Sequence, residues 1–134
     1  MLYNIMNTIC AEPLKKVDKI EFGMERDVVR KLYGEYEEFK KSEYSENTTD
    51  DFGSFHVYYD ENNKCEAVEI FDDVEVTVNG EVIFPVKIEE AEKIESSFVR
   101  DEEGLISIEK SIGIYAPDED MESILFGKKG YYEN

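Results

Sequence analysis

The sequence predicts an α+β fold built mainly from antiparallel strands. Two hairpin patterns carry this prediction: residues 54–71, where strand-like runs flank Asn62-Asn63, and residues 74–84, where β-branched runs flank Asn79-Gly80. Asparagine and glycine tolerate the positive φ that tight hairpin turns require, so both patterns are strong signals. Two segments with apolar side chains at helical spacing add two helices. We therefore expect one mainly antiparallel sheet with both helices packed on one face.

The N-terminal third begins with an ambiguous extension. The apolar side chains of residues 1–16 fit either a helical stripe or a short strand, and Pro13 is expected to end either one. Residues 17–22 alternate apolar and charged side chains and predict a strand. Residues 25–33 then have helical spacing, with Gly34 placed to follow the helix.

The first hairpin has a predictable register. A two-residue turn at Asn62-Asn63 gathers apolar side chains on one face by pairing Tyr59 with Glu66, Val57 with Val68, and Phe55 with Ile70. A slip by one residue would move these side chains to the other face, which favours this register. The opposite face then presents Tyr58 beside Ala67, and His56 beside Glu69.

The segments around the hairpins are simpler. Residues 42–53 are polar and predict a loop. Residues 87–98 predict the second helix. Three further strands are expected at 105–108, 112–115 and 123–126. The last two strands echo the first hairpin, so a strand–helix–hairpin unit used twice and two unrelated hairpins are both open interpretations.

Length and cysteine content indicate one reduced domain. The chain has 134 residues, close to the commonest domain size, and we expect a single domain, 1–134. Two cysteines do not make a disulfide scaffold. The sequence has no run of eighteen apolar residues and no signal-peptide pattern, so we expect a cytoplasmic protein.

The charge is unevenly distributed. The net charge is −18, and residues 42–134 carry all of it, because residues 1–41 hold eight acidic and eight basic side chains. Such acidity repels nucleic acid and anionic membranes. It also steers basic proteins toward the chain. We therefore expect a basic protein as partner, and neither nucleic acid nor membrane.

The predicted partner-binding residues are Tyr58, Glu69, Asp72, Asp73 and Glu75. Glu69 shares a predicted sheet face with Tyr58, and the other three carboxylates continue from the same edge. Aromatic side chains beside charged ones are typical of binding hot spots. The alternative is that these acidic side chains serve only solubility.

Catalytic and metal sites are not expected. His56 lies across from Glu69, as a general base would require, but no nucleophile stands at a recognisable spacing, and an exposed cross-strand pair is the simpler interpretation. The acidic segments 72–75 and 118–122 lack the spacing of a calcium-binding loop. We expect no catalytic residue, no metal and no cofactor.

Two resemblances bear on function. Residues 20–29 with Gly34 resemble a strand, Gly-Met, helix, Gly module shared by the outer-membrane assembly lipoprotein BamE and β-lactamase-inhibitory proteins. From Ile20 to Tyr132 the chain is similar to a group of small acidic bacterial proteins. Their motifs are Phe-Gly-Met (22–24), Asp-Phe (51–52), Val-Tyr-Tyr-Asp (57–60), Glu-Ala-Val-Glu (66–69), Gly-Ile-Tyr-Ala-Pro (113–117) and Lys-Gly-Tyr-Tyr (129–132).

These small proteins look like the immunity proteins that neutralise toxins delivered between bacteria. The resemblance implies a non-enzymatic, toxin-binding antitoxin whose partner is a basic domain such as a nuclease. A structural or housekeeping interaction protein of unknown partner is one alternative, and an enzyme using His56 is another.

Overall fold

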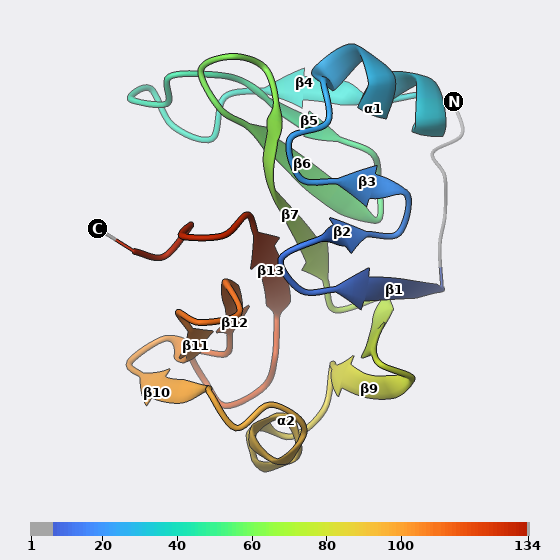
Figure 1. Ribbon diagram of the computed structural model, residues 1–134. Coiled ribbons are helices and arrows are strands. Elements are labelled where there is room, and N and C mark those ends of the chain that lie inside the picture. The colour runs from blue at the N-terminus through green and yellow to red at the C-terminus, as the bar shows by residue number, and fades with distance from the viewer. Residues whose placement is uncertain (1–6, 134) are drawn as a thin grey trace.

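Two sheets and two helices make up the described part of the chain, residues 7–133 of a computed structural model (Figure 1). The helices are α1 (Arg26–Tyr33) and α2 (Ile88–Ile94). One sheet has the strand order β3-β2-β1-β8-β9 and comprises β1 (Thr8–Glu12), β2 (Lys16–Val17), β3 (Ile20–Glu21), β8 (Glu75–Val78) and β9 (Glu81–Phe84). All its strand pairs are antiparallel except β1 and β8, which are parallel.

The second sheet has eight strands in the order β10-β11-β12-β13-β7-β6-β5-β4, and every neighbouring pair is antiparallel. Its strands are β4 (Glu37–Phe39), β5 (Thr49–Asp51), β6 (Phe55–Tyr59), β7 (Cys65–Phe71), β10 (Val99–Asp101), β11 (Gly104–Ser107), β12 (Ile112–Tyr115) and β13 (Ser123–Gly127). The α+β class is therefore confirmed, with two sheets where one was expected.

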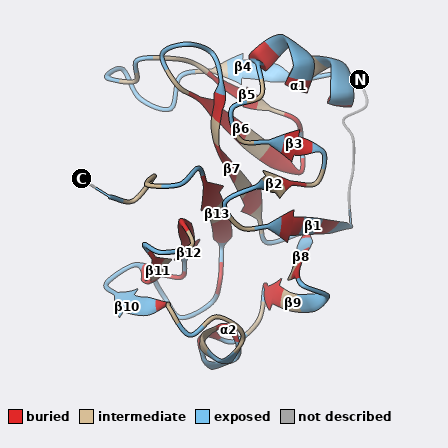
Figure 2. Ribbon diagram, viewed as in Figure 1, coloured by how far each residue is buried: buried red, intermediate tan, exposed pale blue. Residues whose placement is uncertain are grey.

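One face of the eight-stranded sheet, which we call the inner face, is apolar and buried. Val57 pairs with Val68, and Val68 pairs in turn with Phe126 of β13. Each of these three side chains is at most 1% exposed. Figure 2 shows the same burial along β6, β7 and β13. The buried side chains of both sheets and both helices form one hydrophobic cluster.

Both helices lie on the inner face, as predicted. On α1, Arg26 and Arg30 bind Asp50, which the strand pairing places on the same face as Val57. On α2, Glu89 and Glu92 bind Arg100 of β10, on the same face at the other end of the sheet. Figure 1 accordingly shows α1 at the top and α2 at the bottom of the molecule.

The chain repeats one structural unit. In each half a helix is followed by four antiparallel strands, β4–β7 after α1 and β10–β13 after α2, and the strand order reads symmetrically outward from the central β7–β13 pair. The Val57–Val68 pair of the first hairpin corresponds to the Ile114–Ile124 pair of the second. The structure thus supports the repeated-unit interpretation. The halves differ most between β4 and β5, which residues 40–48 connect, whereas residues 102–103 connect β10 and β11.

The predicted hairpin register needs one correction. Val57–Val68 and Phe55–Ile70 pair as expected, but Tyr59 pairs with Cys65 and not with Glu66. The register shifts at a bulge between Tyr58 and Tyr59. A bulge places two residues of one strand opposite one residue of the other, which the two-residue turn model did not include.

Several predicted boundaries were also wrong. Residues 17–22 form a small hairpin, β2–β3, because the chain turns at Asp18 with φ 54°. The second helix ends at Ile94, not at residue 98, because Glu95 is extended. In the ambiguous N-terminal extension, residues 8–12 form a strand, and residues 1–6 lie outside the described part of the chain.

The predicted loop 42–53 contains strand β5, and strands β4 and β10 were not predicted. The inward side chain of β5 is Asp50. Strands β4 and β10, at the two edges of the sheet, are equally rich in charged residues. These strands therefore lack apolar alternation. The inward residues of β4, β5 and β10 form ion pairs with the helices, and these ion pairs replace apolar packing.

Candidate protein-binding face

The opposite side of the eight-stranded sheet, which we call the outer face, carries no helix and no second sheet in the described part of the chain. The cross-strand pairs align one residue of each strand in a single row. From β4 to β10 the row reads Glu37, Asp51, His56, Glu69, Leu125, Gly113, Ile106 and Val99. One end of the row is therefore acidic and the other end apolar.

The charged strand positions of the outer face are all acidic. Its strand positions include the carboxylates Glu37, Asp51, Glu69 and Asp101 and no lysine or arginine. The acidic side chains on the inner face, by contrast, are neutralised: Asp50 binds two arginines of α1. Among the described residues, no lysine or arginine forms an ion pair with the four outer-face carboxylates, so their charge is left for a cationic ligand.

Aromatic rings surround the acidic end of the row. The His56 ring lies between Phe39 and Phe71, with centroid distances of 5.1 and 4.6 Å. Its Nε2 is 3.5 Å from Asp51 Oδ2. His56 does lie opposite Glu69 in the strand pairing, as predicted, but the carboxylate that it contacts is that of Asp51.

Tyr58 and Glu69 form an internal pair. The Tyr58 hydroxyl donates to one oxygen of Glu69, and the Ser123 hydroxyl donates to the other at 2.7 Å. Tyr58 is 8% exposed, and burial together with the hydrogen bond to Glu69 raises the pKa of its hydroxyl. The structure therefore brings these two predicted residues together but leaves little of Tyr58 for a partner to contact.

The other three predicted residues are exposed. Asp72 and Asp73 form the turn that follows β7, at the end of the outer face where Phe71 lies. Glu75 begins β8 and belongs to the five-stranded sheet. The predicted set thus divides between two sheets.

Two C-terminal tyrosines, Tyr131 and Tyr132, lie on the outer face. A Cβ atom on Gly127 would lie 2.5 Å from Tyr131 Cβ, and a Cβ atom on Gly113 would lie 2.0 Å from Tyr132 Oη. The two glycines therefore make room for the two rings, which are 5.2 Å apart between centroids. A glycine in a strand can mark such a close approach, and this was the available signal.

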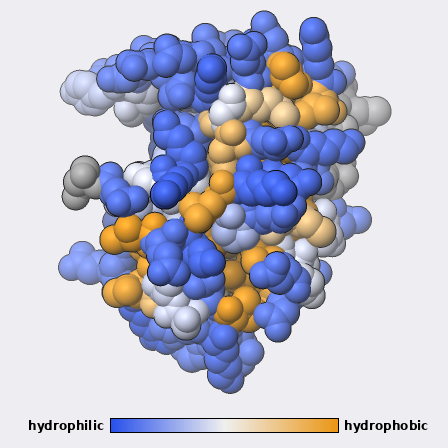
Figure 3. Space-filling model, viewed as in Figure 1, coloured by the Kyte–Doolittle hydropathy of each residue, from blue (hydrophilic) through white to orange (hydrophobic). Residues whose placement is uncertain are grey.

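The apolar end of the row is open. Val99 is 68% exposed and Tyr115 on β12 is 43% exposed. A pocket of about 210 Å³ lies here, with Ile106, Leu125 and Tyr132 in its lining beside Asp101. Figure 3 shows a mostly hydrophilic surface, with hydrophobic side chains gathered at the lower left over β10 and β11.

Among residues 7–133, no group of three or more His, Cys, Asp or Glu side chains is arranged to hold a metal ion. The helices described are too short and too polar to cross a membrane. Comparison with protein-family models, curated proteins and solved structures finds no match to this chain.

Proposed function

We propose that this protein is a non-enzymatic binding module whose outer face binds a basic protein. In its most specific form, the proposed function is that of an immunity protein, which neutralises a basic toxin such as a nuclease. The observation that carries the proposal is the outer face itself: a sheet surface that no helix or second sheet of the described residues covers, with carboxylates, no lysine or arginine at its strand positions, and aromatic and apolar side chains beside them.

The dimensions of the face suit a protein partner. Neighbouring strands are about 4.8 Å apart, so eight strands extend over roughly 34 Å. A standard interface buries about 800 Å² on each partner, which a face of this width accommodates. The open apolar end offers apolar surface that a partner can bury, and the acidic end attracts and orients a cationic partner.

The electrostatics suit a nuclease. A nucleic-acid-binding groove is lined with lysine and arginine, which bind phosphates. Carboxylates aligned across a sheet attract the same cationic groups and thereby compete with the nucleic acid. The net charge of −18 adds long-range steering, which raises the association rate at low ionic strength.

The test combines protection and kinetics. The chain is coexpressed with a basic toxin domain encoded beside its gene, and survival is scored. Association and dissociation rates are then measured at about 50 and 500 mM salt, where the Debye length falls from roughly 14 Å to 4 Å. We expect the association rate to fall at least about tenfold with added salt and the dissociation rate to change less.

Charge reversals locate the interface. Asp72→Lys/Asp73→Lys and, separately, Glu37→Lys should slow association further. The matched control, Glu21→Lys/Glu81→Lys, reverses two exposed charges on the five-stranded sheet and should have a smaller effect. Equal association rates at both salt concentrations, or equal effects of all reversals, would contradict binding through the outer face.

The same measurements separate the two forms of the proposal. Suppose that a basic partner binds through the outer face but that the chain gives no protection against its toxicity. This result would indicate an interaction module with another role. Protection that depends on Asp72 and Asp73 would support immunity.

A further inference from the structure

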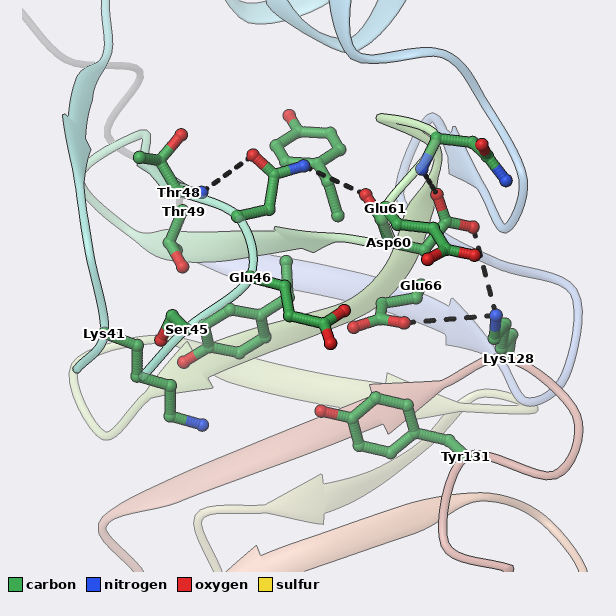
Figure 4. A pocket seen from close by; sticks show the side chains of 14 residues that line it. Lys41, Ser45, Glu46, Thr48, Thr49, Asp60, Glu61, Glu66, Lys128 and Tyr131 are labelled. Atoms are coloured by element: carbon green, nitrogen blue, oxygen red, sulfur yellow. Dashed lines mark hydrogen bonds and ion pairs between the residues drawn. The ribbon is translucent and has the colours of Figure 1, made fainter. Parts of the chain in front are cut away.

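A pocket of about 630 Å³ lies beside the outer face (Figure 4). Loop 40–48, the β6–β7 turn and the C-terminal segment after β13 enclose it. Its charged lining comprises Glu46, Asp60, Glu61, Glu66, Lys41 and Lys128. The pocket lies in the first half of the repeat, where residues 40–48 connect the third and fourth strands from the centre.

An aromatic wall of this pocket already holds a cation. The Lys41 ammonium lies 4.6 Å from the centroid of the Tyr58 ring. A cation over the face of a tyrosine ring is attracted by the negative face of the π system. Figure 4 shows Tyr131 entering the pocket from the C-terminal segment, so that a second tyrosine lines it. The Tyr58 ring of the pocket therefore already binds one cation, which belongs to the chain itself.

The carboxylates in the pocket are only partly neutralised. Glu66 Oε1 is 3.9 Å from Lys128 Nζ, and the same ammonium is 4.0 Å from Asp60 Oδ2. One positive charge is therefore shared between two carboxylates. Glu46 makes no hydrogen bond or ion pair within residues 7–133, and it points toward Glu66 (Figure 4). Burial raises the pKa of Glu66, Lys128 opposes that shift, and Asp60 and Glu46 add to it.

We propose that this pocket receives an arginine side chain of the partner protein, with its guanidinium between Glu46 and Glu66 and its stem against Tyr131. Arginine suits the site because its planar head binds carboxylates through several N–H groups and stacks on aromatic rings. Tyr58 lies on the outer face, so an arginine here would belong to the same interface. This inference rests on the proposed function and adds a specific anchor to it.

The first test uses the full chain and a small probe, L-argininamide, without any partner. Binding is followed by amide chemical shifts, with uncharged citrullinamide as the control ligand. We expect argininamide to shift amides of loop 40–48 and of the β6–β7 turn. Glu46→Gln/Glu66→Gln should weaken this binding at least about tenfold, whereas Glu21→Gln/Glu81→Gln, the same change of charge outside the pocket, should weaken it less.

A second variant should act in the opposite direction. Lys41→Met removes the internal ammonium from the Tyr58 ring but keeps a stem of similar length, so argininamide should bind several-fold tighter. Lys40→Met removes the same charge from the neighbouring position, which does not line the pocket, and should have the smaller effect. A merely structural role for Lys41 would not produce tighter binding.

The outcomes are distinguishable from those of the proposed function. If citrullinamide binds as well as argininamide, or the Glu→Gln pair leaves binding unchanged, the pocket is not an arginine site, although the outer face can still bind a partner. If the pair abolishes argininamide binding but leaves the affinity for the basic partner unchanged, a partner arginine does not occupy the pocket. Loss of both supports the inference.

Discussion

Asp50 provides a quantitative test of how the first half of the fold is held together. Its carboxylate is fully buried and accepts four hydrogen bonds: from Arg26 Nη2 at 2.9 Å, from Arg30 Nε and Nη2 at 2.8 Å each, and from the Tyr59 hydroxyl at 3.0 Å. Asp50→Ala would remove all four acceptor contacts and leave the Arg26 side chain, 9% exposed, without its closest carboxylate.

Breaking a buried ion pair by removing one partner typically costs about 3–5 kcal/mol, because the remaining charge stays desolvated. The lower end applies here, since Arg30 is 21% exposed and keeps Glu38 at 3.1 Å. We therefore expect a loss of about 3 kcal/mol. Because 1 kcal/mol shifts Tm by roughly 4 °C in a domain of this size, Tm should fall by about 12 °C.

Urea denaturation followed by circular dichroism measures this loss, and a double-mutant cycle identifies its cause. Arg26→Met/Asp50→Ala removes both partners, so it should be more stable than the sum of the two single losses predicts. A loss below about 1 kcal/mol for Asp50→Ala, or strict additivity in the cycle, would refute the view that an unpaired buried charge carries the cost.

The same group predicts a pH dependence. Burial alone would raise the pKa of Asp50, but hydrogen bonds from Arg30, Arg26 and Tyr59 outweigh it and hold the pKa below its usual value. A depressed pKa contributes stability above the unfolded value of about 3.9, and this stability is lost as the pH falls through the folded pKa. Asp50→Asn should therefore lose less stability than the parent between about pH 4 and 2.

Two further predictions concern the core. Val68→Asp places an unpaired charge at a fully buried position and should abolish cooperative unfolding, whereas Val99→Asp, at a 68% exposed position, should change Tm by no more than about 3 °C; similar melting of the two variants would contradict the inner-face assignment. Burial raises the pKa of the Cys65 thiol to about 12, while Cys10 is exposed, so a thiol reagent at pH 8 should label Cys10 rapidly and Cys65 only after denaturation. Rapid labelling of both cysteines in the folded protein would contradict that burial.

Sequence patterns predicted the elements whose stability is local. Asn79 and Gly80 do adopt positive φ, 52° and 81°, and the hairpin around them forms. The strands that pattern reasoning missed depend on distant partners. Asp50 is an inward strand residue only because α1 supplies two arginines, and no alternation within residues 42–53 reveals that.

The candidate face could be predicted only in part, because some of its residues are brought together by distant segments of the chain. Glu69, Asp72 and Asp73 follow directly from the register of one hairpin, and the structure places them on or at the end of the outer face. The full row requires the pairing of Glu69 with Leu125, which local patterns do not specify. The burial of Tyr58 depends on Lys41 and on the C-terminal segment, both remote from its own strand.

The central position of β7 has a consequence for synthesis of the chain. Its neighbour β13 is synthesised after β8 to β12, so β7 presents an unpaired edge until residues 123–127 have been made. Unpaired apolar strand edges promote association between nascent chains. A chain cut in the loop between β7 and β8 would yield two fragments that match each other at two strand edges, β7 with β13 and β1 with β8. Fragment complementation in cells, scored by recovery of binding, would then report pairing of the two fragments across both edges.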